Sequence, residues 1–287
     1  MDHWLALDVG GTKIRQAVVA RDGFIQSSRT WTGAAVAEPS KFRDELVAEW
    51  RASRAGRPLG VGIAIAAMVD PVGYVRAAPN LVSWEGLNLV EIFQRELGCP
   101  VHVVFDGTAA LLGELWLGSP GVLNGFAISI GTGIGGGLVV DGQVLYGAHR
   151  LSGMPTSGLI SEPEGLEALA SGPAVAAAAG VDSGVEALRR RREGDQLAVA
   201  AFERASRALY EAIAAVTATV DVDTVMVAGG FGAGAFDFLF PDKVLPDEYR
   251  RYRLVHDDVR IRAAVTGALA PLLGAARYAA LQEGSNR

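Results

Sequence analysis

Two glycine-rich turns in this chain could hold the phosphate groups of a nucleotide. The first lies in Asp8–Lys13, where Gly10, Gly11 and Thr12 stand between the aspartate and the lysine, and the second is Gly131-Thr132-Gly133. Glycine lets the backbone approach an anion, and neighbouring N–H groups, a hydroxyl and an ammonium favour its charge. A carboxylate before the first turn could hold Mg²⁺ through water. Neither turn is a Walker loop, and either one alone would also fit a structural hairpin.

The elements that must position these turns follow one plan twice. Each turn joins an apolar strand to a return strand, from Trp4–Val9 to Lys13–Val19 and from Gly125–Ile130 to Leu138–Val140. Further apolar runs and helical spacings predict strands at Leu59–Met68, Val101–Phe105 and Asp223–Ala228, and helices at Leu89–Leu97, Thr108–Trp116, Gly165–Ala179, Asp195–Val220 and Ala263–Leu281. Strand clusters that alternate with helices predict an α/β architecture, repeated in two halves.

Composition excludes several classes of function. The chain has 287 residues, half of them hydrophobic, and a formal charge of −6, whereas nucleic-acid binding normally needs a basic face. The basic run Arg189–Arg192 sits beside acidic residues and is typical of a solvated helix end. Cys99 is the one cysteine, so neither an intrachain disulfide nor a cysteine zinc cluster can form. The apolar run at the N-terminus is too short for a membrane span, so we expect a cytoplasmic protein without nucleic-acid or membrane partners.

Four motifs occur in one order along the chain. They are the Asp8–Lys13 hairpin, a strand that ends at Asp106, the glycine hairpin Gly131–Gly137 and the strand exit Ala228–Gly232. This order resembles the ROK sugar kinases (repressors, open reading frames, kinases) of the actin–hexokinase–Hsp70 superfamily. The resemblance covers nearly the whole chain and extends to Gly62–Asp70, Ala78–Leu81 with Trp84, Gly147–His149, and Gly165–Glu167 leading to Ser171-Gly172.

The resemblance implies an architecture and a set of partners. The fold would be α/β, with two related actin-like ATPase (ribonuclease H-like) lobes and a cleft between them. One lobe would comprise 1–107 plus 263–287 and the other 108–262. The expected ligands are ATP, Mg²⁺ and a small sugar-like molecule, and the expected assembly is a homodimer.

The resemblance also assigns roles to single residues. Asp106 falls where these kinases keep the catalytic base, which takes the proton of a primary hydroxyl as its oxygen attacks the γ-phosphorus. Both glycine turns would bind phosphates, and Asp8 would be the Mg²⁺ partner. The adenosine motif would include Gly229, Gly230 and Phe231, and the substrate-binding positions would be Ala67, Asn80, Phe105, Asp106, Met154, Ser157 and Glu167.

The residues at the sugar-binding positions depart from the family pattern. The family's Asn before the base is Phe105 here, its sugar-binding Glu is Met154, and its sugar- or zinc-binding His is Ser157. The cysteine zinc loop is replaced by Ile160–Gly165, while Glu167 keeps the position of a last sugar-contacting carboxylate. A site built to hydrogen-bond a hydroxyl rejects an analogue without it by about four to five orders of magnitude. Losing these polar groups should therefore weaken glucose binding.

The sequence thus favours an ATP-dependent kinase for a primary hydroxyl of a hexose-like substrate other than plain glucose. Candidate acceptors are a modified sugar and a carbocyclic analogue such as a C7-cyclitol. Two alternatives stay open at this point. One is an ordinary glucokinase-like enzyme whose contacts have drifted, and the other is a non-catalytic sugar-binding pseudokinase or regulator.

The replaced loop generates a prediction about metal content. Ile160–Gly165 offers only carboxylate ligands and the chain has one thiol, whereas closed zinc sites are normally built from Cys and His. Metal analysis of the purified protein should therefore find zinc well below one ion per chain. Stoichiometric zinc that survives dialysis would refute this expectation.

Overall fold

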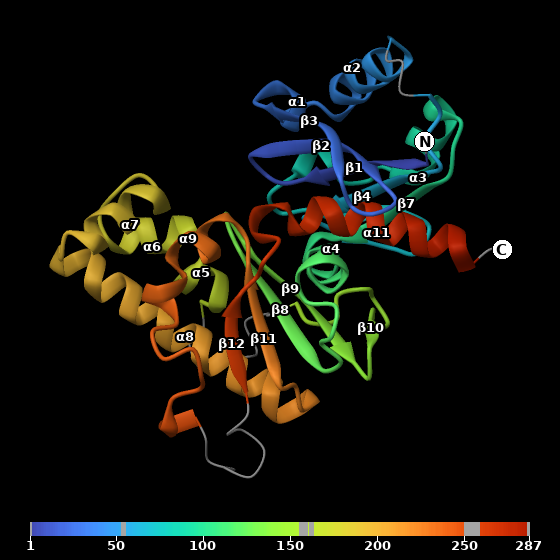
Figure 1. The fold of residues 1–287 in the computed structure, drawn as a ribbon. Coiled ribbons are helices and arrows are strands. Elements are labelled where there is room, and N and C mark those ends of the chain that lie inside the picture. The colour runs from blue at the N-terminus through green and yellow to red at the C-terminus, as the bar shows by residue number, and fades with distance from the viewer. Residues whose placement is uncertain (1, 53–55, 155–159, 161–163, 250–258, 286–287) are drawn as a thin grey trace. The chain divides into compact units, whose positions relative to one another are not determined.

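A computed structural model describes residues 2–52, 56–154, 160, 164–249 and 259–285 (Figure 1). The chain divides into two compact units. Unit 1 comprises Met1–Leu117, Tyr146–Ser152 and Leu269–Arg287, and unit 2 comprises Gly118–Leu145 and Gly153–Ala268. Each unit has its own sheet and its own hydrophobic core.

The sheet of unit 1 has the strand order β3-β2-β1-β4-β7. Its strands are β1 (His3–Val9), β2 (Lys13–Ala20), β3 (Ile25–Thr32), β4 (Val61–Ile65) and β7 (Val101–Phe105). The first three form antiparallel pairs, and β4 and β7 then add in parallel. Every residue of β1 and β4 is buried, which is why these segments read as continuous apolar runs rather than as alternating patterns.

Shorter elements and helices complete unit 1. They are α1 (Ala34–Ala37), α2 (Pro39–Ala52), β5 (Met68–Val69), β6 (Val75–Ala77), the 3₁₀ turn Val82–Trp84, α3 (Leu89–Leu97), α4 (Asp106–Gly113) and α11 (Ala270–Ser285). The bounds of α3 follow from its caps, because the Asn88 side chain accepts a hydrogen bond from the Glu91 amide and Gly98 ends the helix with positive φ. An aromatic cluster centred on Phe42 of α2 joins this helix to β3, to the 3₁₀ turn and to α3 through Trp31, Trp84 and Phe93.

The sheet of unit 2 repeats the same plan. Its order is β10-β9-β8-β11-β12, with β8 (Gly125–Ile130), β9 (Ile134–Val140), β10 (Gln143–Leu145), β11 (Thr224–Ala228) and β12 (Arg260–Ala263). Here too the first three strands pair antiparallel and the last two pair parallel. The expected α/β fold with two related halves is therefore confirmed.

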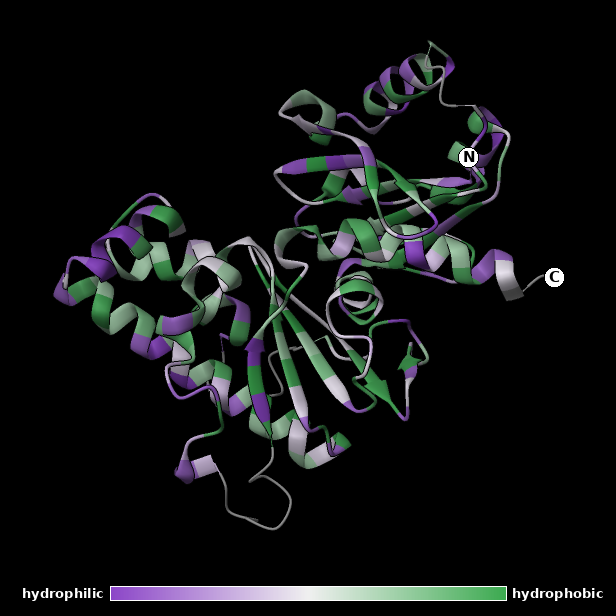
Figure 2. Ribbon diagram, viewed as in Figure 1, coloured by the Kyte–Doolittle hydropathy of each residue, from purple (hydrophilic) through white to green (hydrophobic). Residues whose placement is uncertain are grey.

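Helices cover the sheet of unit 2. They are α5 (Leu166–Ala170), α6 (Gly172–Ala178), α7 (Gly184–Arg192), α8 (Gln196–Val220) and α9 (Gly230–Leu239). Figure 2 shows hydrophobic residues along the central strands and a largely hydrophilic α7. The arginines at the end of α7 form ion pairs at the surface, since Arg189 contacts both Glu186 and Glu193, as expected for a solvated helix end. None of the described helices is long and apolar enough to cross a membrane.

Two helices expected from the sequence have different bounds. The segment Gly165–Ala179 is not one helix, because Ser171 is extended (φ −67°, ψ 158°) and its side chain caps α6 through the Ala174 amide. The expected helix Ala263–Leu281 begins only at Ala270, because Arg260–Ala263 pairs with β11 as a parallel strand.

The helix α11 packs against α4 with their backbones in contact. A Cβ atom on Gly274 would overlap the carbonyl oxygen of Ala109, and one on Gly113 would overlap that of Ala270. On the sheet side, a Cβ on Gly62 would overlap the carbonyl oxygen of Ala275. Because of this packing, α4 belongs to unit 1, whereas the sequence placed the division at 107/108, just inside the start of α4.

This contact gives a stability prediction. Gly274→Ala should lower the free energy of unfolding by about 1–3 kcal/mol or more, because the added methyl group meets backbone that cannot move aside cheaply. Gly284 is the matched control, since it lies in the same helix and a Cβ there would meet nothing. Gly284→Ala should leave stability unchanged or raise it by up to about 1 kcal/mol. Equal effects in urea unfolding would contradict the described packing.

Candidate functional site

The first glycine turn closes the β1–β2 hairpin of unit 1. The Gly10 amide donates to the Lys13 carbonyl oxygen at 3.0 Å, and both Thr12 and Lys13 are exposed. Gly11 lies directly against Asn80, because a Cβ on Gly11 would be 3.0 Å from the Cβ and carbonyl oxygen of Asn80. The structure therefore brings a predicted phosphate-binding residue and a predicted substrate-binding residue together.

The carboxylate of Asp8 forms an ion pair with Arg15. The two residues are partners across β1 and β2, and Asp8 Oδ2 accepts hydrogen bonds from Arg15 Nε at 2.8 Å and from Nη2. Asp8 is only 7% exposed. Burial raises the pKa of Asp8 above its ordinary value, while the nearby charges of Arg15 and Lys13 act in the opposite direction. The sequence interpretation missed Arg15, although the length of the turn places it opposite Asp8.

Asp106 is the first residue of α4, directly after the end of β7. Its Oδ1 accepts a hydrogen bond from the Gly107 amide at 2.8 Å, and the residue is partly exposed. Phe105 occupies the N-cap position without a side-chain hydrogen bond and is only 4% exposed. Phe105 thus presents little surface to any ligand, whereas the Asp106 carboxylate lies at a helix N-terminus, which favours its charge.

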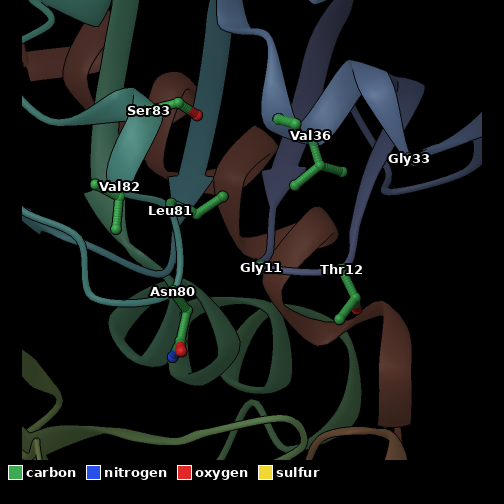
Figure 3. A pocket seen from close by; sticks show the side chains of 9 residues that line it. Gly11, Thr12, Gly33, Val36, Asn80, Leu81, Val82 and Ser83 are labelled. Carbon is green, nitrogen blue, oxygen red and sulfur yellow. The ribbon is translucent and has the colours of Figure 1, made fainter.

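A recess of about 410 Å³ lies beside the first glycine turn, entirely within unit 1 (Figure 3). In Figure 3, Val36 and Leu81 extend toward each other, while Thr12 and Asn80 point to the same side, below them. The lining residues are Gly11, Thr12, Gly33, Val36, Ala37, Asn80, Leu81, Val82 and Ser83. The sequence interpretation assigned no role to Gly33, Val36 and Ala37, because the segment around α1 carries no motif, and it assigned none to Val82 and Ser83, which follow the Asn80 motif.

The second glycine turn is held by three hydrogen bonds within unit 2. The Gly131 amide donates to the Gly133 carbonyl oxygen at 2.9 Å, and the Gly172 amide at the start of α6 donates to the Gly131 carbonyl oxygen at 2.9 Å. Glu167 Oε2 accepts a hydrogen bond from the Ile134 amide at 2.9 Å. Glu167, the predicted substrate carboxylate, is therefore hydrogen-bonded to the residue that follows the phosphate turn.

The predicted adenosine motif meets the same turn. Gly229 has φ 83°, and a Cβ there would lie 2.7 Å from the Ile130 amide nitrogen. Glycine is needed at Gly229 for both reasons. The Phe231 ring packs over Gly184, where a Cβ would be 2.9 Å from the ring, and also lies against Gly172. Gly172 thus contacts both predicted nucleotide segments of unit 2, although the sequence gave it no role.

The remaining predicted residues take no part in the contacts given above or lie outside the described residues. Ala67 is 3% exposed between β4 and β5, and Met154 is half-buried in unit 2. Ser157 and part of the replaced loop Ile160–Gly165 lie outside the described residues. Across the described part of the chain, no group of three His, Cys, Asp or Glu side chains could hold a metal ion.

Comparison with known proteins supports the resemblance to the ROK family that the sequence motifs indicate. A model described as the ROK family matches residues 4–282. N-acetylmannosamine kinases of Escherichia coli and Shigella flexneri are each 30% identical over 243 residues, 79% of this chain and 83% of the relative.

Solved structures of similar fold include two ROK sugar kinases. A ROK family glucokinase from Streptomyces griseus, in complex with glucose and AMPPNP, superposes with a TM-score of 0.82 at 25% identity, over 97% of this chain and 99% of that one. A ROK hexokinase from Thermus thermophilus superposes with a TM-score of 0.79 at 27% identity, over 99% of both chains.

The buried ion pair gives a pH-dependent prediction. Arg15→Ala should lower the free energy of unfolding by about 2–4 kcal/mol at pH 7, because it leaves the buried Asp8 carboxylate unpaired. A carboxyl with a raised folded-state pKa contributes stability that is present below its unfolded pKa of about 3.9 and is lost as pH rises through the folded value. The deficit of Arg15→Ala comes from the ionised Asp8 carboxylate that has lost its partner. It should therefore shrink as pH falls toward about 4 and this carboxyl becomes protonated in the folded state.

Denaturant unfolding at several pH values measures this deficit. Arg21→Ala is the control, since Arg21 is an exposed arginine of the same unit, and it should have little effect at any pH. A deficit for Arg15→Ala that stayed constant between pH 7 and pH 4 would contradict the role given to Asp8.

Proposed function

Since the chain belongs to the ROK family, we propose that it transfers the γ-phosphoryl group of ATP to a primary hydroxyl of a hexose-like sugar. Its curated relatives are sugar kinases, so the chain is a carbohydrate kinase. One observation carries the proposed reaction. Asp106 offers its carboxylate at the N-terminus of α4, in a chain that keeps both glycine turns of the family pattern.

In the proposed mechanism Asp106 acts as the general base. Its carboxylate accepts the proton of the primary hydroxyl while the hydroxyl oxygen forms a bond to the γ-phosphorus. The bond from this phosphorus to the β–γ bridging oxygen breaks, and ADP leaves. Catalysis then consists mainly of positioning and neutralising charge. Backbone N–H groups of the glycine turns and the ammonium of Lys13 are the groups of this chain that would neutralise phosphate charge.

Separate groups of residues in this chain would hold ATP and Mg²⁺. The Gly131–Gly133 turn and Gly229–Phe231 would hold the nucleotide, because glycines leave their backbone open to close approach. Mg²⁺ commonly keeps several waters and binds through phosphates and one or two carboxylates. Asp8 fits the part of an outer partner through water, since Arg15 already binds its Oδ2. When bound, the ion would neutralise charge on the transferring phosphate.

The acceptor in this proposal is a substituted sugar rather than glucose. Phe105 and Met154 replace polar residues of the family pattern, and Phe105 is buried in the structure. The similarity to N-acetylmannosamine kinases supports an N-acetylated hexosamine as the first candidate, and the carbocyclic analogue stays a further candidate. The proposal includes a zinc-free cytoplasmic homodimer without nucleic-acid or membrane partners.

A second candidate function is an ordinary glucokinase, which the similarity to the Streptomyces griseus enzyme favours. The two candidates differ in one measurable ratio. We expect kcat/KM for N-acetylmannosamine or a deoxy or carbocyclic analogue to exceed that for glucose at saturating Mg-ATP. A glucose value of about 10⁴ M⁻¹s⁻¹ or more that matched or exceeded all analogues would establish the glucokinase instead. No turnover with any acceptor would favour a non-catalytic sugar-binding protein.

The role of Asp106 gives a further prediction. Asp106→Asn should lower kcat by about two to four orders of magnitude, the usual contribution of a positioned base. Binding of ATP, measured by calorimetry, should change little. Asp44→Asn is the control, because Asp44 is an exposed aspartate of α2 in the same unit, and it should leave kcat unchanged. If Asp106→Asn kept more than a tenth of the rate, another group would be the base.

A further inference from the structure

The recess beside the first glycine turn has an apolar interior that the phosphate chemistry does not use. Val36 and Leu81 extend toward each other across it (Figure 3), and both are nearly buried. Val82 also lines the recess and is 69% exposed. An apolar group placed here would remove the exposed Val82 surface from water, which is favourable in proportion to the area buried.

Polar groups at the same recess match an amide. Asn80 and Ser83 both line it and are both exposed. The Asn80 side chain carries both a donor and an acceptor, and the Ser83 hydroxyl can act as either. A ligand with an amide next to an alkyl chain would pair these polar groups and also cover the exposed surface of Val82. A sugar hydroxyl alone would leave the apolar surface exposed.

The walls of the recess are fixed to each other before any ligand binds. The buried Trp84 side chain donates from Nε1 to the Val36 carbonyl oxygen at 2.8 Å, which connects α1 to the 3₁₀ turn Val82–Trp84. The Leu81 amide donates to the Ala78 carbonyl oxygen at 2.8 Å. A site with walls held in this way loses less conformational entropy on binding than one that must be assembled.

The volume of the recess indicates the size of the group that it accepts. About 410 Å³ lies within the range of sites that hold whole small ligands, so a single methyl group would fill only a small part of it. We propose that this recess binds the acyl chain of an N-acylated hexosamine and accepts chains longer than acetyl. The inference rests on the proposed function and specifies its substrate class.

A series of N-acylmannosamines tests the inference directly. N-acetyl, N-propanoyl, N-butanoyl and N-pentanoyl derivatives are compared as acceptors at saturating Mg-ATP, and their binding without nucleotide is measured by calorimetry. We expect Kd and KM to fall about two- to fourfold for each added methylene, up to the value for a fully buried CH₂ group. Affinity that stays flat or weakens beyond acetyl would overturn the inference.

Two matched variants test whether the dependence of Kd on chain length arises in this recess. Val82→Ser removes apolar surface from the recess and should flatten the dependence of Kd on chain length. Val72→Ser changes another exposed valine of unit 1, 62% exposed and outside the recess, and should keep the dependence. If Val82→Ser kept it as well, the acyl chain would bind elsewhere and the inference would be wrong.

The same data separate the two proposals. Absence of phosphoryl transfer to every acceptor would overturn the proposed function, while the calorimetric series would still test the recess. Transfer to short and long acyl derivatives with equal KM and equal Kd would support the kinase and reject the subsite.

Discussion

The close contact between α4 and α11 is the constraint on which the position of Asp106 depends. Gly274 and Gly113 let the two helices approach until backbone meets backbone, and Gly62 lets α11 settle on β4 in the same way. In a close-packed protein interior, a change in the volume of one residue displaces the residues around it. Because Asp106 is the first residue of α4, a shift of α4 against α11 would move the proposed base relative to the end of β7. The last helix of the chain therefore supports a residue far from it in sequence.

The two glycine turns differ in the charged residues and hydrogen bonds that surround them. In unit 1 the turn carries exposed Thr12 and Lys13, and the buried Asp8 behind it is balanced by Arg15. In unit 2 the turn has no charged residue of its own, and Glu167 and Gly172 hold it by hydrogen bonds to its backbone. Both turns end an apolar strand at the centre of a sheet with the same strand order. The duplicated sheet thus positions two chemically different turns with one backbone plan.

Much of this could be predicted from the sequence, because it depends on local patterns. The strands Val101–Phe105 and Gly125–Ile130 and the helix Leu89–Leu97 have the expected bounds, since apolar runs and caps define them. The alternation of strand clusters with helices predicted the α/β fold, and the order of the four motifs indicated the family. Contacts between distant segments could not be predicted in this way. The break at Ser171, the pairing of β12 with β11 and the Gly274 contact depend on which neighbours meet, and the recess at Val36 depends on a hydrogen bond from Trp84.

The central claim is that a primary hydroxyl of a sugar-like acceptor receives the γ-phosphoryl group of ATP. Proton-coupled ³¹P NMR of the product formed from N-acetylmannosamine and Mg-ATP tests it most directly. A phosphate ester on a primary carbon is split into a triplet by the two protons of that carbon, and this triplet is expected together with ADP in equal amount. A doublet would mean that a secondary or anomeric hydroxyl had reacted, and release of inorganic phosphate alone would mean that water was the acceptor. Either result would contradict the proposed reaction.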